Sequence, residues 1–206
     1  MLFPPGRRVN EQAKKNAERL LQYYKEMGYQ NCCVSSLDLG GGVQFLKKHD
    51  YSGSMFLSAN IKKDGKEFFQ KGRLYNIKGL KIAVFGITDR PPINLPKGVS
   101  ISRPDSAMKA LLPTIKGKAD IVIMLTSMDL TKTRSLLKQY PDIDLVISSG
   151  APVPTYVPIK AGKSLIVSSH PKGKSVGIIA LTVEKGKIKK YDNKLIMLRD
   201  SALNSF

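Results

Sequence analysis

The chain has 206 residues, 42% of them hydrophobic, and a formal net charge of +18 from 34 Lys and Arg against 16 Asp and Glu. This length suits one sizeable core. No apolar run approaches the ~20 residues that span a bilayer, and the stretch from Met1 to Gly6 lacks the features of a secretory signal peptide. The composition predicts a soluble globular domain and argues against a membrane-spanning one.

The positive charge is spread along the chain, with dense stretches at 14–15, 47–48, 62–63 and 185–190. Spread charge gives solubility and a general attraction for polyanions. A solvated basic surface is the simpler interpretation, and the alternatives are an acidic polymer, anionic lipid or an acidic protein as partner. Specific nucleic-acid binding is not expected, because the sequence has no paired Cys/His finger and no aromatic ribonucleoprotein signature.

The two cysteines, Cys32 and Cys33, are adjacent. Neighbouring residues of an extended segment point to opposite faces, which disfavours a mutual disulfide, and the spacing does not suit zinc. We expect them to be small buried residues on a strand.

Helical spacing of apolar residues predicts a helix over residues 10–27, with Asn10 as its N-cap and Gly28 as its stop. The next predicted elements are a strand at 31–35, a triple-glycine turn at 40–42 opening a short helix, a strand at 54–60, and a hairpin of strands 68–77 and 80–86 turning at 78–79. The continuous apolar run at 81–87 is typical of a central strand buried on both faces.

Residues 90–104 are rich in Pro and Ser and are predicted to form a loop. A helix is expected at 106–115, capped by Asp105 or Ser106 and disturbed near its end by Pro113. The remaining predictions are a strand at 120–125, a helix at 130–140, a strand at 144–148, and short strands at 156–159, 164–168, 175–183 and 189–198. The order predicts an α/β fold whose sheets continue into a β-rich C-terminal end.

Five segments carry a family resemblance through their local sequence and their order. They are residues 56–61, 79–88, 119–125, 142–147 and 173–177. Together they resemble the catalytic domain of 5′-nucleotidases and UDP-sugar hydrolases in the calcineurin-like metallophosphoesterase superfamily. The resemblance implies a layered sandwich of mixed sheets flanked by helices, as one domain over 1–206 that lacks the family's first strands and its C-terminal substrate domain.

Enzymes of this family hold two divalent metal ions with Asp, His and Asn side chains, and the metals clamp the phosphate and activate a water molecule. The family's Asp-x-His and Gly-Asp motifs have no match here. Its Gly-Asn-His-Glu motif aligns with residues 35–38, its Ser-His motif with 126–127, and its Gly-His-x-His motif with 149–152. The degenerate motif positions are Ser36, Leu37, Asp38, Ser127, Gly150 and Pro152.

Leucine, glycine and proline side chains offer no metal ligand. The two histidines, His49 and His170, lie at no motif position. The resemblance therefore implies no bound metal and a non-catalytic domain with a binding or structural role. One alternative is a residual phosphoester hydrolase that uses Asp38, Asp89 and Asp129, and another is a basic module that binds polyanions.

Two smaller features remain. His170, Lys172 and Lys174 form a compact basic loop that could meet an anionic group, although an exposed turn is the simpler interpretation. The Gly-x-Ser-x-Gly string at 173–177 does not suit a nucleophile elbow, because it leads into a predicted strand and both histidines precede it. Since the family is mostly extracytoplasmic, the resemblance also implies a periplasmic or cell-surface location.

Overall fold

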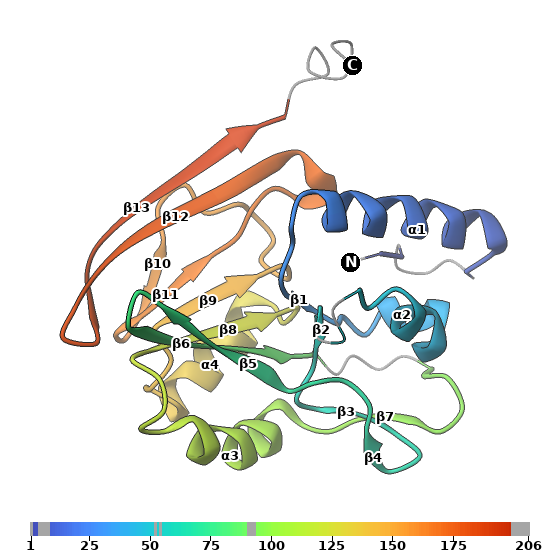
Figure 1. Cartoon of the computed structure of the whole chain (residues 1–206), viewed down its shortest axis with the longest axis horizontal. Helices are drawn as coiled ribbons and strands as arrows, with labels where there is room; N and C mark the ends of the chain where they lie inside the picture. The colour runs from blue at the N-terminus through green and yellow to red at the C-terminus, as the bar shows by residue number, and fades with distance from the viewer. Residues whose placement is uncertain (1, 4–8, 52, 54, 90–93, 199–206) are drawn as a thin grey trace.

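The structure is a computed structural model that describes residues 2–3, 9–51, 53, 55–89 and 94–198. Its centre is a six-stranded sheet in the order β10-β11-β9-β8-β6-β5 (Figure 1). The strands are β5 (Gly72–Ile77), β6 (Leu80–Ile87), β8 (Ile121–Thr126), β9 (Leu145–Ser148), β10 (Ile159–Ala161) and β11 (Ser164–Val167). The four inner strands are parallel, and the edge strands β5 and β10 pair antiparallel to them.

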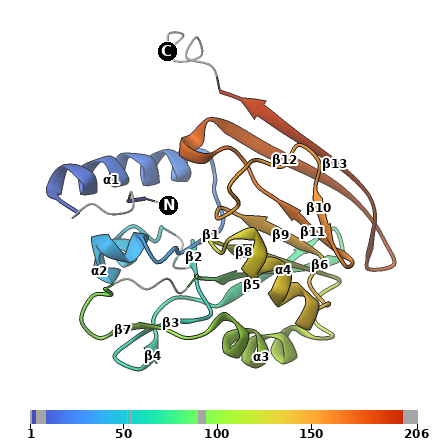
Figure 2. The same cartoon turned by 180° about the vertical axis from the view of Figure 1, so that it is seen from behind.

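Helices α3 (Pro104–Ile115) and α4 (Leu130–Gln139) cover one face of this sheet, as Figure 2 shows from behind. Alternate strand residues point to opposite faces, and those on the helical side are buried in the main core. The main core contains Phe85, Met124 and Val146 from the sheet with Met108 and Leu136 from the helices. This packing fixes the positions at which β6, β8 and β9 end.

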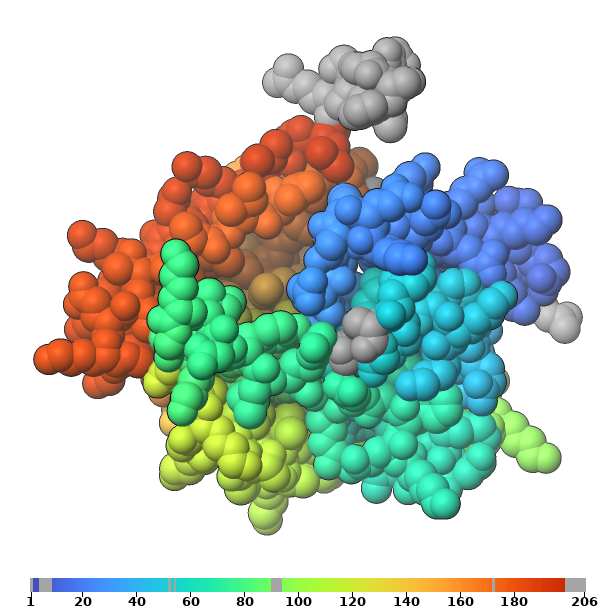
Figure 3. All heavy atoms as spheres, in the orientation of Figure 1, coloured from blue at the N-terminus to red at the C-terminus, as the bar shows by residue number. Residues whose placement is uncertain are grey.

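A long hairpin of β12 (Ser175–Glu184) and β13 (Lys187–Met197) lies over the other face. Its Ile179, Leu181, Ile188 and Tyr191 pack on Leu145, Leu165 and Val167 of the sheet. The cover is partial, because Ile147, on the same face as Leu145, is 42% exposed. Figure 3 shows the hairpin (red), β5 (green) and α1 (blue) around a hollow on this side of the molecule.

The N-terminal half adds a smaller layer beside β6. It consists of α1 (Glu11–Glu26), β1 (Cys32–Cys33), the 3-10 turn η1 (Asp38–Gly41), α2 (Val43–Lys48), β2 (Phe56–Leu57), β3 (Ile61–Lys63), β4 (Lys66–Glu67) and β7 (Val99–Ile101). Leu21, Leu46, Phe56 and Ile101 belong to its separate core. A β-carbon at Gly86 would lie closer than 3.0 Å to the main chain of Leu57, so only glycine permits this approach of β2 to β6.

The predicted α/β class with sheets flanked by helices is confirmed, as are the first helix with its Asn10 cap and the hairpin of β5 and β6. Cys32 and Cys33 lie on a strand as free thiols, but both are only partly buried. The structure describes no helix that is long and apolar enough to cross a membrane.

Three expectations for the chain from residue 90 onward were wrong. The segment 90–104 contains β7, which pairs with β3, itself not predicted. Helix α3 begins at Pro104, and neither Asp105 nor Ser106 caps it, since the N-cap is Arg103 without a side-chain bond. The helix ends at Ile115 as expected, and Pro113 lies inside its last turn, where a missing N–H affects only one bond. The strand expected at 156–159 begins at Ile159.

Candidate functional site

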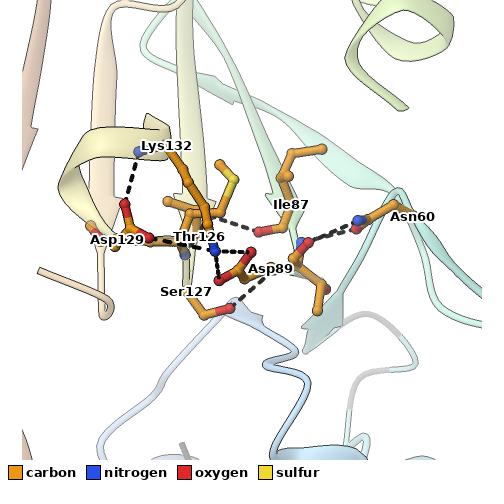
Figure 4. A network of polar contacts seen from close by, with 10 residues as sticks. Asn60, Ile87, Asp89, Thr126, Ser127, Asp129 and Lys132 are labelled. Carbon is orange, nitrogen blue, oxygen red and sulfur yellow. Dashed lines mark hydrogen bonds and ion pairs between the residues drawn. The ribbon is translucent and has the colours of Figure 1, made fainter. Parts of the chain in front are cut away.

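The candidate site lies where the parallel strands β6 and β8 end and the chain turns into polar loops (Figure 4). Asp89 follows β6 by two residues, and Ser127 follows β8 directly. In α/β sheets ligands commonly bind at this carboxyl edge. The Asp89 backbone N–H donates to Ser127 Oγ over 3.3 Å, so the two loops are joined.

Lys132 places a positive charge between two carboxylates at this edge (Figure 4). Asp129 caps α4 by accepting from the Lys132 backbone N–H at 2.8 Å. The Lys132 ammonium lies 3.1 Å and 2.9 Å from the Asp89 carboxylate oxygens and 3.5 Å from Asp129 Oδ2. The hydrogen bond to Asp89 is the main cause that raises the pKa of Lys132. The Lys132 side chain is half exposed, so water screens this ion pair.

A buried network ties the strand ends together behind the ion pair. Asn60 and Thr88 exchange two bonds, since the Thr88 N–H donates to Asn60 Oδ1 at 2.9 Å and Asn60 Nδ2 donates to the Thr88 carbonyl at 2.8 Å. Thr88 Oγ1 donates to the Val34 carbonyl at 2.7 Å and lies 2.8 Å from Ser58 Oγ. These residues hold loops from β1, β2 and β6 in one arrangement.

The loops after β8 and β9 are closed onto each other. Ser148 Oγ donates to the Met128 carbonyl at 3.2 Å and accepts from the Gly150 N–H at 3.2 Å. A β-carbon at position 150 would lie less than 3.0 Å from the carbonyl oxygens of both Ser127 and Met128. Position 150 therefore has no room for a side chain unless the main chain moves.

The loop after β1 uses its acidic residue for structure. Asp38 is only 4% exposed, and its carboxylate accepts from the Ser35 N–H at 2.9 Å and from the Leu2 N–H. Ser36 is buried and Leu37 is partly buried in the same turn. A carboxylate that holds the N-terminal segment and its own turn is a structural group, and Asp38 is not part of the ion-pair cluster.

The structure thus brings together Ser127, Gly150, Asp89 and Asp129 from the predicted set, while Pro152 is exposed in the loop beyond. It does not add Asp38 to Asp89 and Asp129. Lys132 and the Asn60–Thr88 pair were missed from the sequence. The available signal for Lys132 was its place in the first turn of a predicted helix, three residues after Asp129 in the loop that follows the strand.

The residues present do not fit a pair of divalent cations. In the described parts of the chain, no three His, Cys, Asp or Glu side chains lie together where they could hold a metal ion. Hard divalent ions take about six oxygen ligands each, whereas this edge offers two carboxylates that already share an ammonium. We therefore derive no reaction step through a metal at this edge.

The basic loop predicted around His170 is partly committed to internal contacts. The His170 backbone N–H donates to Ser175 Oγ at 3.0 Å, and the ring Nδ1 lies 2.9 Å from the same hydroxyl. The ring Nε2 lies 3.4 Å from the Tyr156 hydroxyl. Ser175 is only 6% exposed, so this Ser–His contact is structural. Lys174 is exposed, and anion binding by His170, Lys172 and Lys174 stays a prediction.

The sheet order, the helical and hairpin layers and the loops at the strand ends define an α/β domain with the fold of 5′-nucleotidase-type metallophosphoesterases. No protein-family model matches the chain.

The particular similarities are to much longer proteins. The sulfate thiohydrolase SoxB of Thermus thermophilus superposes with a TM-score of 0.77 at 20% identity. The superposition covers 88% of this chain and 35% of the SoxB chain. A 5′-nucleotidase precursor from the same species gives 0.70 at 18% identity, covering 88% and 41%. A curated 5′-nucleotidase of Vibrio cholerae is 28% identical over 130 residues, or 58% of this chain. The match spans only 24% of that protein's length.

Proposed function

We propose that this chain is a non-catalytic metallophosphoesterase-like domain with a binding or structural role. The observation that carries the proposal is the closure of Gly150 onto the carbonyls of Ser127 and Met128. Position 150 aligns with a metal-binding histidine of the family, and position 127 aligns with another. Where two imidazoles would converge on a metal, this chain has main chain packed against main chain.

Electrostatics supports the same conclusion. The Lys132 ammonium already pairs with both Asp89 and Asp129 at the strand ends. A divalent cation would meet the repulsion of this ammonium, or would have to displace it and take over its carboxylates. A domain that binds no metal here lacks both the charge clamp on phosphate and the activated water that the family's reaction requires.

A binding role is supported by the partly covered face of the central sheet. Ile147 on this face is 42% exposed, and the segment 151–154 beside the candidate site is rich in proline and apolar residues. Exposed apolar surface at the rim of a packed sheet suits contact with another polypeptide. The domain limits and an extracytoplasmic location remain proposals, the latter supported by the precursor form of one structural relative.

The experiment is a hydrolysis assay with purified chain, a nucleoside monophosphate or a UDP-sugar, and added manganese, cobalt or zinc. We expect rates equal to those of metal and substrate alone, while the Vibrio cholerae 5′-nucleotidase serves as the active control. Metal-stimulated turnover that an Asp89→Asn variant loses and an Asp192→Asn variant keeps would overturn the proposal. Asp192 is a suitable control because it is exposed on β13.

The residual-hydrolase alternative draws support from the convergence of Asp89 and Asp129 on Lys132. The same assay decides it, because it requires turnover that depends on both carboxylates. The polyanion alternative requires binding that falls steeply with salt concentration.

A further inference from the structure

We propose that the opposite edge of the central sheet carries a second site, which binds an amphipathic monoanion. A cavity of about 970 Å³ opens there. Asp120 and Asp144 lie at its rim, and they directly precede β8 and β9. The cavity is therefore at the amino ends of the strands whose carboxyl ends form the candidate site, and the inference does not rest on the proposed function.

Three elements that are far apart in the sequence form the walls. The last turn of α3 contributes Leu112 and Ile115, the segment after α4 contributes Tyr140, and the start of β13, next to the hairpin turn, contributes Ile188. Gly186 brings that turn onto Asp120, since a β-carbon there would lie 3.8 Å from the Asp120 β-carbon. Pockets for small molecules have volumes of about 300–1,000 Å³ and mostly apolar walls, which this cavity matches.

The floor is apolar and well packed. Met108 is fully buried and Val122 is 9% exposed, and both belong to the main core. A ligand that covered this floor would remove apolar surface from water, which contributes roughly 25 cal/mol per Å². The cavity therefore suits a molecule with an aromatic or aliphatic body.

The charges at the rim select the head group. Four lysines and three aspartates line the cavity, but the carboxylates are largely committed. Asp120 accepts from the Lys81 N–H at 2.8 Å, and Asp144 accepts from the Val122 N–H at 2.9 Å. Asp142 lies 3.6 Å from Lys163.

The remaining lysines, Lys109, Lys116 and Lys187, are exposed. Within the described residues they have no ion-pair partner. Their ammonium groups are available to an anion from outside the chain. A lining with one excess positive charge matches a carboxylate or sulfonate better than a dianion, so the ligand class is an apolar body with one anionic head.

The test is a fluorescence titration with anilinonaphthalene sulfonate, which has an aromatic body and one sulfonate, followed by competition with decanoate and with decanol. We expect saturable binding at one site, displacement by decanoate, and weaker displacement by the uncharged decanol. A Lys116→Glu/Lys187→Glu variant should bind the probe about tenfold more weakly, because two exposed attractive charges become repulsive and water screens both. The matched control, Lys62→Glu/Lys66→Glu, reverses two exposed lysines on β3 and β4.

A second variant tests the cavity without a change of charge. Ala119→Phe places a ring among the lining residues and should abolish probe binding, with thermal unfolding used to confirm that the variant is folded. Equal affinity of the wild type, the lysine variant and a folded Ala119→Phe variant would overturn the proposal. Equal weakening by both lysine pairs would also overturn it, because the probe would then report only the basic surface. Hydrolysis assays at the other edge do not affect either result.

Discussion

The α-carbon of Gly150 packs against the carbonyl oxygen of Ser127, so that any β-carbon at position 150 would lie less than 3.0 Å from it. These two residues come from loops after different strands, β9 and β8. Their contact joins the two loops that would have to separate if imidazole groups were to project between them.

The first prediction concerns this contact. Gly150→Ala should lower the free energy of unfolding by about 1–3 kcal/mol, the usual cost of overpacking a site that cannot relax. Gly177→Ala is the matched control, because its added β-carbon would meet a leucine methyl at 3.5 Å and a serine β-carbon at 3.9 Å, both ordinary contacts. Denaturant unfolding measures both variants, and an equal effect of the two substitutions would show that position 150 is not closed.

The second prediction concerns the ammonium at the strand ends. Lys132→Gln leaves Asp89 and Asp129 without their shared cation. Loss of this positive charge makes the edge more negative and should strengthen its attraction for a divalent ion, so manganese should raise the melting temperature of this variant more than that of the wild type. Lys138→Gln, at an exposed position in the last turn of the same helix, should respond like the wild type. The same manganese effect in all three proteins would contradict this reasoning.

The third prediction follows from a partly buried carboxylate. Burial raises the pKa of Asp144 above its usual value, so the folded chain binds the proton more tightly than the unfolded chain. This group therefore lowers stability as the pH rises through the ordinary carboxyl pKa and the folded one, and the loss is complete above the latter.

Asp144→Asn keeps an oxygen that can accept from the Val122 N–H. It should be more stable than the wild type at neutral pH, with a gain that disappears as the solution is acidified below the ordinary carboxyl pKa. Thermal unfolding across this range measures the difference, and Asp142→Asn, which is exposed, serves as the control. A gain that persists in acid would show that the charge is not its cause.

The fourth prediction concerns the thiols of β1. Burial raises the pKa of Cys32 to about 11 and that of Cys33 to about 12. Because only the thiolate reacts, alkylation by iodoacetamide at mildly alkaline pH should be at least about a hundredfold slower in the folded chain than in urea. Mass spectrometry of timed samples measures both rates. Similar rates in the two states would mean that the segment opens readily.

Segments with strong local signals were predictable. The apolar run at 81–87 indicated a central strand, and β6 lies between β5 and β8 with Phe85 and Ile87 fully buried. Strands β3, β4 and β7 were missed because each has only two or three residues, too few for alternation to be recognised. The pairing of β3 with β7 joins segments about 40 positions apart in the chain, which no local pattern encodes. The pairing of β3 with β4 is local, through Asp64 and Gly65, and this short turn was missed in the sequence.

The sequence indicated which loops form the candidate site but not which contacts their residues make. Sequence alignment placed Ser127 and Gly150 in the relevant loops, and the structure brings those loops into contact. The ion pair of Lys132 with Asp89 joins residues 43 positions apart, and the sequence showed Lys132 only as a charge on a solvated helix. Closure at Gly150 likewise depends on the relative placement of two loops, which residue type alone does not determine.

The ion pair of Lys132 also bears on how such a domain can change over generations. A histidine introduced at position 150 would clash with main-chain atoms before any second ligand existed to bind metal. A histidine introduced at position 127 would lie in a loop beside carboxylates that already pair with the Lys132 ammonium. Neither single substitution creates a metal site, so substitutions at other surfaces are expected to be tolerated more readily than substitutions in these two loops.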